Sequence, residues 1–386
     1  CSARKLASMK SLAAFFLRFQ QFGGDPAIVQ RRGYRRDVWS YAELAQCAVR
    51  MALKLRQRGI CAGDRILLWG SNSAEWVGVF WGCILRGAVL VPLDEGATPE
   101  FARSVAADAG VKLAVVSREK AAVVLPGTIL ILEEFASSAG GQGSDSHIPP
   151  AGEKLFSLAA TLADKPLTRK DIAQILFTSG TTGEPRGVVL THGNFLANLE
   201  PIEQGFAPYR RYERWFHPLR FVTLVPLSHV FGQFMALLVP PVLGATVVIE
   251  LSASPAEIVH TAKRERATAL IAVPRMLDSL RGGLGRESEA RGRKAAFARR
   301  FAAAEGKHFL RRAWRFRKIH RRFGWKFWAF ISGGAALGAE TEAFFRRLGY
   351  AVVQGYGMTE TASLISLNHP FRAAEGPVGK MLPARE

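Results

Sequence analysis

Alternation between helix-like and strand-like segments constrains the fold of this chain most strongly. The segments run in the order helix, strand, helix, strand, helix, strand over residues 40–58, 65–69, 74–85, 88–92, 99–109 and 111–116. Such alternation predicts an α/β fold with a doubly wound, mostly parallel sheet. The first helix also has a start signal, because Ser40 and Glu43 have the spacing of a capping box.

The alternation resumes in the second half of the chain. Strands are expected near residues 221–225, 246–251, 268–273, 326–331 and 351–354. A chain of 386 residues is long for one compact core, which favours a large domain with two lobes. The segment 140–150, rich in Gly, Ser and Pro, is a candidate surface linker. We therefore expect a first α/β lobe over 1–150 and a second over 151–386, which carries a basic insertion at 281–326.

A loop of glycines and hydroxyl residues follows the apolar run at 172–177. It consists of Thr178, Ser179, Gly180, Thr181, Thr182 and Gly183, with Arg186 close behind. Glycine lets the backbone approach an anion closely, and successive N–H groups can bind phosphate. The order differs from a Walker P-loop, because no Lys-Ser or Lys-Thr pair follows the second glycine. The segment predicts a phosphate-binding loop, and an ordinary hairpin turn is the alternative.

The bulk composition bounds the class of protein. The formal net charge of +20 favours anionic partners such as nucleotides, membrane surfaces or nucleic acid. The cysteines Cys1, Cys47, Cys61 and Cys83 show no metal-site spacing, so a reduced, cytosolic compartment is expected. The most apolar region, 221–249, is interrupted by His229, Gln233 and several prolines, which favours a buried core segment over a membrane helix.

Basic residues concentrate at 281–326, where sixteen Lys or Arg stand against three Glu. Helical spacing places a stripe of largely aromatic residues on one face of a basic amphipathic helix over 309–326: Phe309, Ala313, Phe316, His320 and Phe323. Three interpretations stay open: the stripe packs on the protein itself, docks on the anionic inner face of a membrane, or contacts nucleic acid. Nucleic acid is the least favoured of the three.

Four sequence motifs together resemble one enzyme superfamily. They are TSGTTGEPRG at 178–187, PLSHVFGQ at 226–233, SGGAAL at 332–337 and QGYGMTETA at 354–362. This set is similar to the AMP-binding, adenylate-forming (ANL) superfamily, and most similar to its medium- and long-chain fatty acyl-CoA synthetases. The resemblance implies the large N-terminal domain of such an enzyme, with two doubly wound, mostly parallel sheets and flanking helices.

The resemblance also implies roles for individual residues. The ATP-binding set would be Thr178, Ser179, Gly180, Thr181, Thr182, Gly183, Arg186, Gly333, Gly334, Ala335, Gln354, Gly355, Tyr356, Gly357 and Thr359, with Tyr356 stacked on adenine. Thr181, Arg186, Thr359 and Glu360 would serve catalysis. Glu360 and Thr178 would hold Mg²⁺, which takes carboxylate and phosphate oxygens. The acyl substrate would contact His229, Val230, Phe231 and Gly232.

The expected reaction is a two-step ligation. A fatty acid carboxylate attacks the α-phosphorus of ATP, pyrophosphate leaves, and the thiol of coenzyme A then attacks the acyl-adenylate. The segment 226–244 contains no Asp or Glu to pair with a substrate amine, which favours an uncharged acyl chain. A carrier protein in place of coenzyme A is an alternative acceptor.

The resemblance also implies parts that are not seen in this chain. A downstream Thr-Gly-Asp motif and a C-terminal domain with a catalytic lysine are expected beyond Glu386. We therefore expect a fragment of a longer enzyme with the acyl site and part of the nucleotide site. A non-catalytic acyl or nucleotide binder is the alternative.

Overall fold

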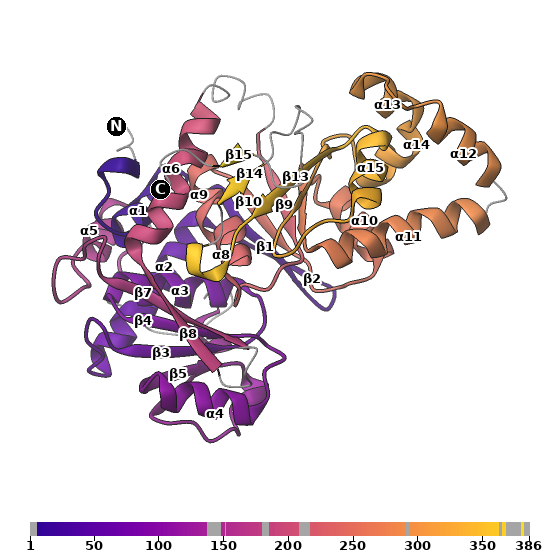
Figure 1. Ribbon diagram of the computed structural model, residues 1–386. Coiled ribbons are helices and arrows are strands. Elements are labelled where there is room, and N and C mark those ends of the chain that lie inside the picture. The colour runs from indigo at the N-terminus through magenta and orange to yellow at the C-terminus, as the bar shows by residue number, and fades with distance from the viewer. Residues whose placement is uncertain are drawn as a thin grey trace. The chain divides into compact units, whose positions relative to one another are not determined.

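Figure 1 shows the fold as a computed structural model, which describes residues 6–136, 148–150, 152–179, 185–207, 217–290, 294–362, 365–367 and 380–381. Most of the expected linker at 140–150 lies outside these residues. Contacts divide the chain into unit 1, Cys1–Arg211 with Pro226–Ala245, and unit 2, Tyr212–Val225 with Thr246–Glu386. No helix in the described ranges has the length and apolarity that crossing a bilayer requires.

Unit 1 is built around a six-stranded sheet in the order β6-β5-β3-β4-β7-β8. Its elements in chain order are η1 (Leu6–Ser8), α1 (Leu12–Phe16), η2 (Leu17–Gln21), β1 (Pro26–Arg32), β2 (Arg35–Ser40), α2 (Tyr41–Gln57), β3 (Arg65–Trp69), α3 (Ala74–Arg86), β4 (Val89–Leu93), α4 (Pro99–Asp108), β5 (Val111–Val116), η3 (Arg118–Lys120), β6 (Thr128–Ile131), η4 (Leu132–Phe135), α5 (Glu153–Ala159), β7 (Ile172–Ser179), β8 (Pro185–Thr191), α6 (His192–Phe206), α8 (Val230–Gln233), the π-helix η6 (Phe234–Leu238) and α9 (Pro240–Leu243). The strands run parallel except for β8, which pairs antiparallel with β7. The expected strands at 65–69 and 111–116 are confirmed with their predicted bounds.

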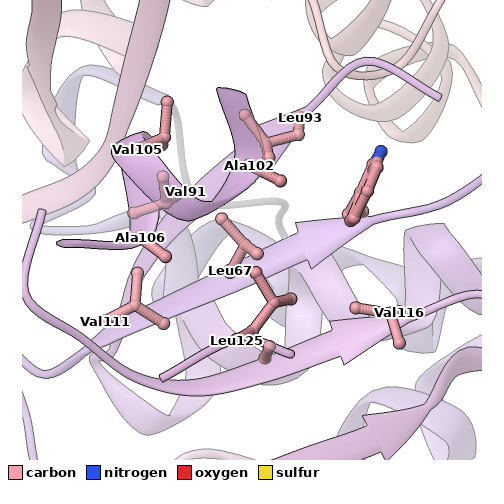
Figure 2. Close-up of a cluster of buried hydrophobic side chains, with 11 residues drawn as sticks. Leu67, Val91, Leu93, Ala102, Val105, Ala106, Val111, Val116 and Leu125 are labelled. Carbon is pink, nitrogen blue, oxygen red and sulfur yellow. The ribbon is translucent and has the colours of Figure 1, made fainter. Parts of the chain in front are cut away.

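Helices cover both faces of this sheet. Helix α4 lies over one face, where Ala102, Val105 and Ala106 pack against Leu67, Val91 and Val116 of the strands (Figure 2). Helix α3 lies on the other face, against β3 and β4, and α2 packs on α3 (Figure 1). Alternate residues of a strand point to opposite faces, so a strand buried on both faces needs a continuous apolar run.

Two sequence features position α2 and α3. The Ser40 hydroxyl accepts from the Glu43 N–H at 3.1 Å while Glu43 Oε2 accepts from the Ser40 N–H at 2.7 Å, which confirms the capping box. Gly78 and Gly82 of α3 then allow close approach, because a Cβ at Gly82 would lie 2.5 Å from the Cβ of Met51 in α2. This helix pair therefore depends on glycine at its contact.

Unit 2 contains a second mostly parallel sheet, with the strand order β15-β14-β13-β12-β11-β9-β10. Its elements in chain order are β9 (Arg220–Thr223), β10 (Thr246–Ile249), α10 (Pro255–Arg264), β11 (Ala269–Ala272), α11 (Pro274–Ala290), α12 (Lys294–Ala302), α13 (Phe309–Arg315), α14 (Arg317–Phe323), β12 (Ala329–Ser332), α15 (Ala339–Leu348), β13 (Ala351–Tyr356), η7 (Thr359–Thr361), β14 (Ser366–Leu367) and β15 (Lys380–Met381). Strands β9 to β13 are parallel, and β14 and β15 add an antiparallel edge. The two sheets with flanking helices confirm the predicted α/β class.

The strands that follow the candidate linker belong partly to the first sheet. β7 pairs with β4 through Leu90 and Gln174, and β8 pairs with β7, so residues up to 191 complete the sheet of unit 1. The segment Pro226–Ala245 also belongs to unit 1. Almost all of the apolar region at 221–249 is buried, as the sequence predicts.

The basic amphipathic segment differs from the prediction of one helix over 309–326. It forms two short helices, α13 and α14, which break at Phe316 with φ −101° and ψ 22°. Phe316 is buried against Phe297 and Phe301 of α12, with ring centroids 5.9 and 6.4 Å apart. Packing of this buried ring accompanies the break, which the regular sequence spacing does not show.

The aromatic stripe itself packs on unit 2. The ring of His320 stacks on Tyr350 at 4.1 Å, and its Nε2 lies 2.9 Å from the carbonyl oxygen of Leu348. Phe323 is fully buried and contacts Phe330. Phe316, His320 and Phe323 therefore pack on the protein, whereas Phe309 at the start of the stripe is 40% exposed. Membrane docking through this stripe is not supported.

Candidate active site

The predicted phosphate loop lies at the tip of the β7–β8 hairpin. In the antiparallel register Thr178 is opposite Arg186, and Ser179 is opposite Pro185. Arg186 is exposed and forms no ion pair with any residue that the structure describes. Gly180, Thr181, Thr182 and Gly183 lie outside the described residues. The hairpin that was the alternative interpretation is present, and a phosphate site at its tip stays a prediction.

A glycine allows this hairpin to close tightly. Gly187 is opposite Phe177, and a Cβ at Gly187 would lie 2.9 Å from Ile175 Cγ2 and 3.2 Å from Phe177 Cζ. Ile175 and Phe177 pack against the apolar cluster under α4. A side chain at position 187 would therefore require Ile175 and Phe177 to shift, so glycine suits the close approach of these two strands.

His229 is the residue directly before α8, without a side-chain capping bond, and it lies beside the carboxylate of Asp94, which follows β4. Its Nε2 is 3.6 Å from Asp94 Oδ2, which is beyond direct hydrogen bonding, and the Ser228 hydroxyl donates to the same oxygen at 3.2 Å. The other oxygen of Asp94 accepts from the Gly96 N–H at 2.9 Å. The side chain of His229 is 64% exposed, so the imidazole is available to a ligand.

The residues after His229 turn inward. Val230, Phe231 and Gly232 are buried, and the apolar segment continues through the π-helix η6, which is buried throughout. A π-helical turn within a helical segment is rare and often occurs at functional sites. Of the predicted acyl contacts, His229 is thus exposed and the next three residues are buried.

A buried pair of carboxamides connects β7 to α8. Gln174 Nε2 donates to Gln233 Oε1 at 2.8 Å, and neither side chain has any exposed surface. Gln174 Oε1 and Gln233 Nε2 have no partner among the described residues. Gln174 shares a strand face with Thr178, because it is four residues earlier in β7. The pair therefore connects the strand that enters the phosphate hairpin to the helix that begins after His229.

The two turns predicted to surround adenine lie at the same edge of the unit 2 sheet. Ser332 pairs with Gln354 in the parallel strands β12 and β13, so the turn at Gly333 follows the carboxyl end of β12. Gly355 and Tyr356 are the last two residues of β13 at the same edge, where the strand extends past its expected end at 354. Ligands of doubly wound sheets bind at such ends. Gly334 has φ +83°, a conformation that favours glycine, and it faces Val273 after β11.

The predicted nucleotide-binding residues of unit 2 differ in exposure. Tyr356 is 50% exposed and Glu360 in η7 is exposed without an ion pair among the described residues. The side chain of Gln354 is buried and donates to Glu342 Oε2 at 2.6 Å, so it is engaged within unit 2. Gly357 and Thr359 are partly exposed. The ring of Tyr356 at the end of β13 and the carboxylate of Glu360 in η7 are thus open to a ligand.

The described ranges contain no group of three His, Cys, Asp or Glu side chains able to hold a metal ion. A magnesium ion that is bound largely by phosphate oxygens and water needs only one or two carboxylates. The exposed carboxylate of Glu360 suits such an ion.

One buried histidine lies near the hairpin. His192 begins α6, its Nδ1 accepts from the Leu12 N–H at 3.3 Å, and its Nε2 has no partner among the described residues. Burial lowers the pKa of His192 to about 4, although the Asp171 charge opposes this shift. The imidazole is therefore neutral at pH 7 and acts in packing.

Sequence reasoning missed Asp94, Gln174 and Gln233. Asp94 is separated from Ser228 by 134 residues, and no spacing pattern connects them. Gln174 had a weak signal, because it is a polar residue within an apolar strand. An uncharged polar residue inside a buried strand needs a hydrogen-bond partner, which Gln233 supplies.

Comparisons with known proteins agree with this fold. A family model described as AMP-binding enzyme matches residues 15–386. The chain is 24% identical over 394 residues to the long-chain-fatty-acid–CoA ligase FadD15 of Mycobacterium bovis, covering 95% of this chain and 63% of that protein. It is 28% identical over 326 residues to the feruloyl-CoA synthase of Amycolatopsis sp, covering 84% and 55%. The solved structure of ATP-bound MatB from Rhodopseudomonas palustris has a TM-score of 0.67 at 26% identity, covering 97% and 65%.

The two sheets and the edge after β12 and β13 define the N-terminal domain architecture of adenylate-forming enzymes. The chain belongs to the AMP-binding enzyme family. It spans between 51% and 63% of the length of the curated relatives that it matches.

Proposed function

We propose that this chain forms the acid- and ATP-binding part of a ligase that activates a fatty acid. The observation that carries the substrate class is the segment Pro226–Ala245, which is almost wholly buried and contains no Asp, Glu, Lys or Arg. A substrate with an amine would leave its charge unpaired there, which is costly. An alkyl chain gains about 0.8 kcal/mol for each buried CH₂.

For nucleotide binding we propose two sets of residues, each described within its own unit. Thr178, Ser179 and the loop at 180–183 would contact the phosphates through N–H groups and hydroxyls, with Arg186 as the fixed charge. Gly333, Gly334 and Ala335 would lie along adenine, with Tyr356 stacked on the ring. The N–H and C=O groups of 354–357 would also contact the nucleotide, because the side chain of Gln354 is already bonded to Glu342.

The chemistry would depend on positioning and on charge neutralisation. The fatty acid carboxylate attacks the α-phosphorus, pyrophosphate leaves, and no covalent intermediate with the protein is needed. Thr181, Arg186 and Thr359 would contact the phosphate oxygens, and Glu360 with Thr178 would hold Mg²⁺. When bound, this ion neutralises charge that develops on the phosphate oxygens.

The exchange of labelled pyrophosphate into ATP tests the first step. We expect exchange that requires Mg²⁺ and a fatty acid such as hexadecanoic acid. Because the chain spans only part of its relatives, the same assay should also be run on any longer protein that its gene encodes. Exchange without any acid, or with amino acids only, would contradict the proposal.

A phenolic acid is the second candidate substrate. Two features favour it: the unpaired ends of Gln174 and Gln233 could bond a substrate hydroxyl, and one relative is a feruloyl-CoA synthase. A buried donor or acceptor without a partner lowers the stability of the protein. A substrate hydroxyl that bonds these groups would remove this penalty and so favour binding. Ferulic acid in the exchange assay separates the two candidates.

For the second step we propose coenzyme A as the thiol acceptor, with the imidazole of His229 beside the thioester path. A carrier protein remains the alternative acceptor, and product analysis with both thiols distinguishes them. A reduced cytosolic location with contact at the inner face of a membrane fits this chemistry. Any such contact through 309–326 would use a face other than the packed aromatic stripe.

A further inference from the structure

Helices α13 and α14 expose apolar and basic side chains. Leu310 and Trp314 are 62% and 70% exposed, and they lie one turn apart on α13. Phe316, which is buried, points into the protein instead. Trp325, directly after α14, is 82% exposed. These residues are distinct from the aromatic stripe that the sequence pattern singles out.

The cations of this surface have no carboxylate partners. Arg311, Arg315, Lys318 and Arg321 are exposed and form no ion pair within the described part of the chain. The guanidinium of Arg317 lies over the Trp314 ring at 4.9 Å. The single acidic residue of 294–326, Glu305, bonds Arg347 at 2.9 Å. The outer face of α13 and α14 is therefore positive without compensation.

Arginines behind this face add to its potential. Burial together with the charges of Arg346 and Arg347 in α15 lowers the pKa of the Arg312 guanidinium. The positive charges of Arg312, Arg346 and Arg347 repel one another. An anionic surface bound nearby would relieve part of this repulsion, because its field acts on all cations within a Debye length.

We propose that this basic–aromatic face, Leu310, Arg311, Trp314, Arg315, Lys318 and Arg321, docks on an anionic lipid bilayer. Trp314 and Leu310 enter the boundary between headgroups and acyl chains, while the four cations contact lipid phosphates and carboxylates. Leu310 favours lipid over nucleic acid, because an exposed aliphatic side chain gains nothing from a phosphate backbone. The proposal does not depend on the proposed enzymatic activity.

Vesicle sedimentation without ATP or coenzyme A tests it. The full chain should bind vesicles of phosphatidylserine and phosphatidylcholine in equal parts at low salt, and binding should weaken at high salt. Trp314→Ala should weaken the partition coefficient about ten-fold. Lys318→Gln should weaken it about five-fold, which corresponds to about 1 kcal/mol per cation near an anionic surface.

Matched controls come from exposed residues of unit 1. Tyr34→Ser and the charge variant Arg56→Gln should bind like the parent chain, because neither residue belongs to the basic–aromatic face. Unfolding curves check that each variant is folded, and Trp314→Phe serves as a second, milder variant.

Three results would overturn the proposal. They are equal binding to pure phosphatidylcholine vesicles, equal loss in the controls and in the Trp314 and Lys318 variants, and absence of binding by the parent chain. Tighter retention by labelled duplex DNA than by anionic vesicles, with the same residues required, would assign the face to nucleic acid instead.

Discussion

Gln174 of β7 donates a hydrogen bond of 2.8 Å to Gln233 of α8, and both side chains are fully buried. This bond connects two segments of the proposed site that are 59 residues apart. The hydrogen bond thereby holds β7, which carries Thr178, at a fixed distance from α8, which begins after His229. A buried hydrogen bond between neutral groups adds little net stability, but removing one of its two partners is costly because the other is left unsatisfied.

The carboxamide pair predicts strong coupling between two substitutions. Gln174→Leu and Gln233→Leu should each lower the free energy of unfolding by about 1–3 kcal/mol, because each leaves a buried amide without its partner. The double variant should lose less than the sum, with a coupling of about 1 kcal/mol. Urea unfolding measures all three, and Gln57→Leu at an exposed position of α2 is the control. Additive losses would show that the two amides are not paired.

Glu360 predicts a loss of magnesium-dependent chemistry. In an enzyme that forms AMP from ATP and a fatty acid, Glu360→Gln should lower kcat about 100-fold or more, because the carboxylate that would hold Mg²⁺ is removed. Glu340→Gln, an exposed carboxylate of α15, should leave the rate nearly unchanged. Full activity of the Glu360 variant would remove this residue from the mechanism.

His192 predicts acid sensitivity of the fold. The pKa of the folded state is about 4 against an ordinary value of 6.5, so the unfolded chain binds more protons between these two pH values. The free energy of unfolding should therefore fall as pH drops through this window, by up to about 3 kcal/mol. His192→Gln should remove this dependence, whereas His260→Gln, at an exposed position of α10, should keep it. An equal slope in the parent chain and in His192→Gln would contradict the assignment.

The close approach of α13 to the turn at Gly349 predicts that a larger residue at this position destabilises the fold. The residue has φ +96°, and a Cβ there would lie 2.6 Å from the backbone nitrogen of Ala313. Gly349→Ala should lower the free energy of unfolding by about 2 kcal/mol or more. Gly306→Ala is matched in backbone conformation, with φ +65°, but its Cβ would meet nothing within 4 Å, so it should cost only about 1 kcal/mol. Equal losses would mean that α13 does not pack on this turn.

Local patterns in the sequence predicted most of the fold. The capping box of Ser40 and Glu43 and the apolar runs of β3 and β5 are decided by neighbouring residues, so their bounds follow from spacing alone. The break at Phe316 could not be predicted this way. It accompanies packing against Phe297 and Phe301, which periodicity does not contain.

The candidate site was predictable where backbone conformation demands a residue type. Gly334 needs a positive φ after β12, and the position of that turn follows from the strand alternation. Asp94 could not be predicted as a neighbour of Ser228 and His229, because their contact depends on the tertiary placement of α8 beside the end of β4. The sequence pattern did not single out the exposed pair Leu310 and Trp314, because the neighbouring aromatic stripe has the more regular helical spacing.

Calorimetric titration with a non-hydrolysable acyl-adenylate mimic tests the central claim most directly. If the fatty acid and nucleotide sites adjoin, the mimic should bind one per chain, and at least about 100-fold more tightly than AMP or the free fatty acid, because the two parts are linked. A mimic that gives no binding heat with folded protein, or that binds no more tightly than AMP alone, would contradict adenylation of a fatty acid by this chain.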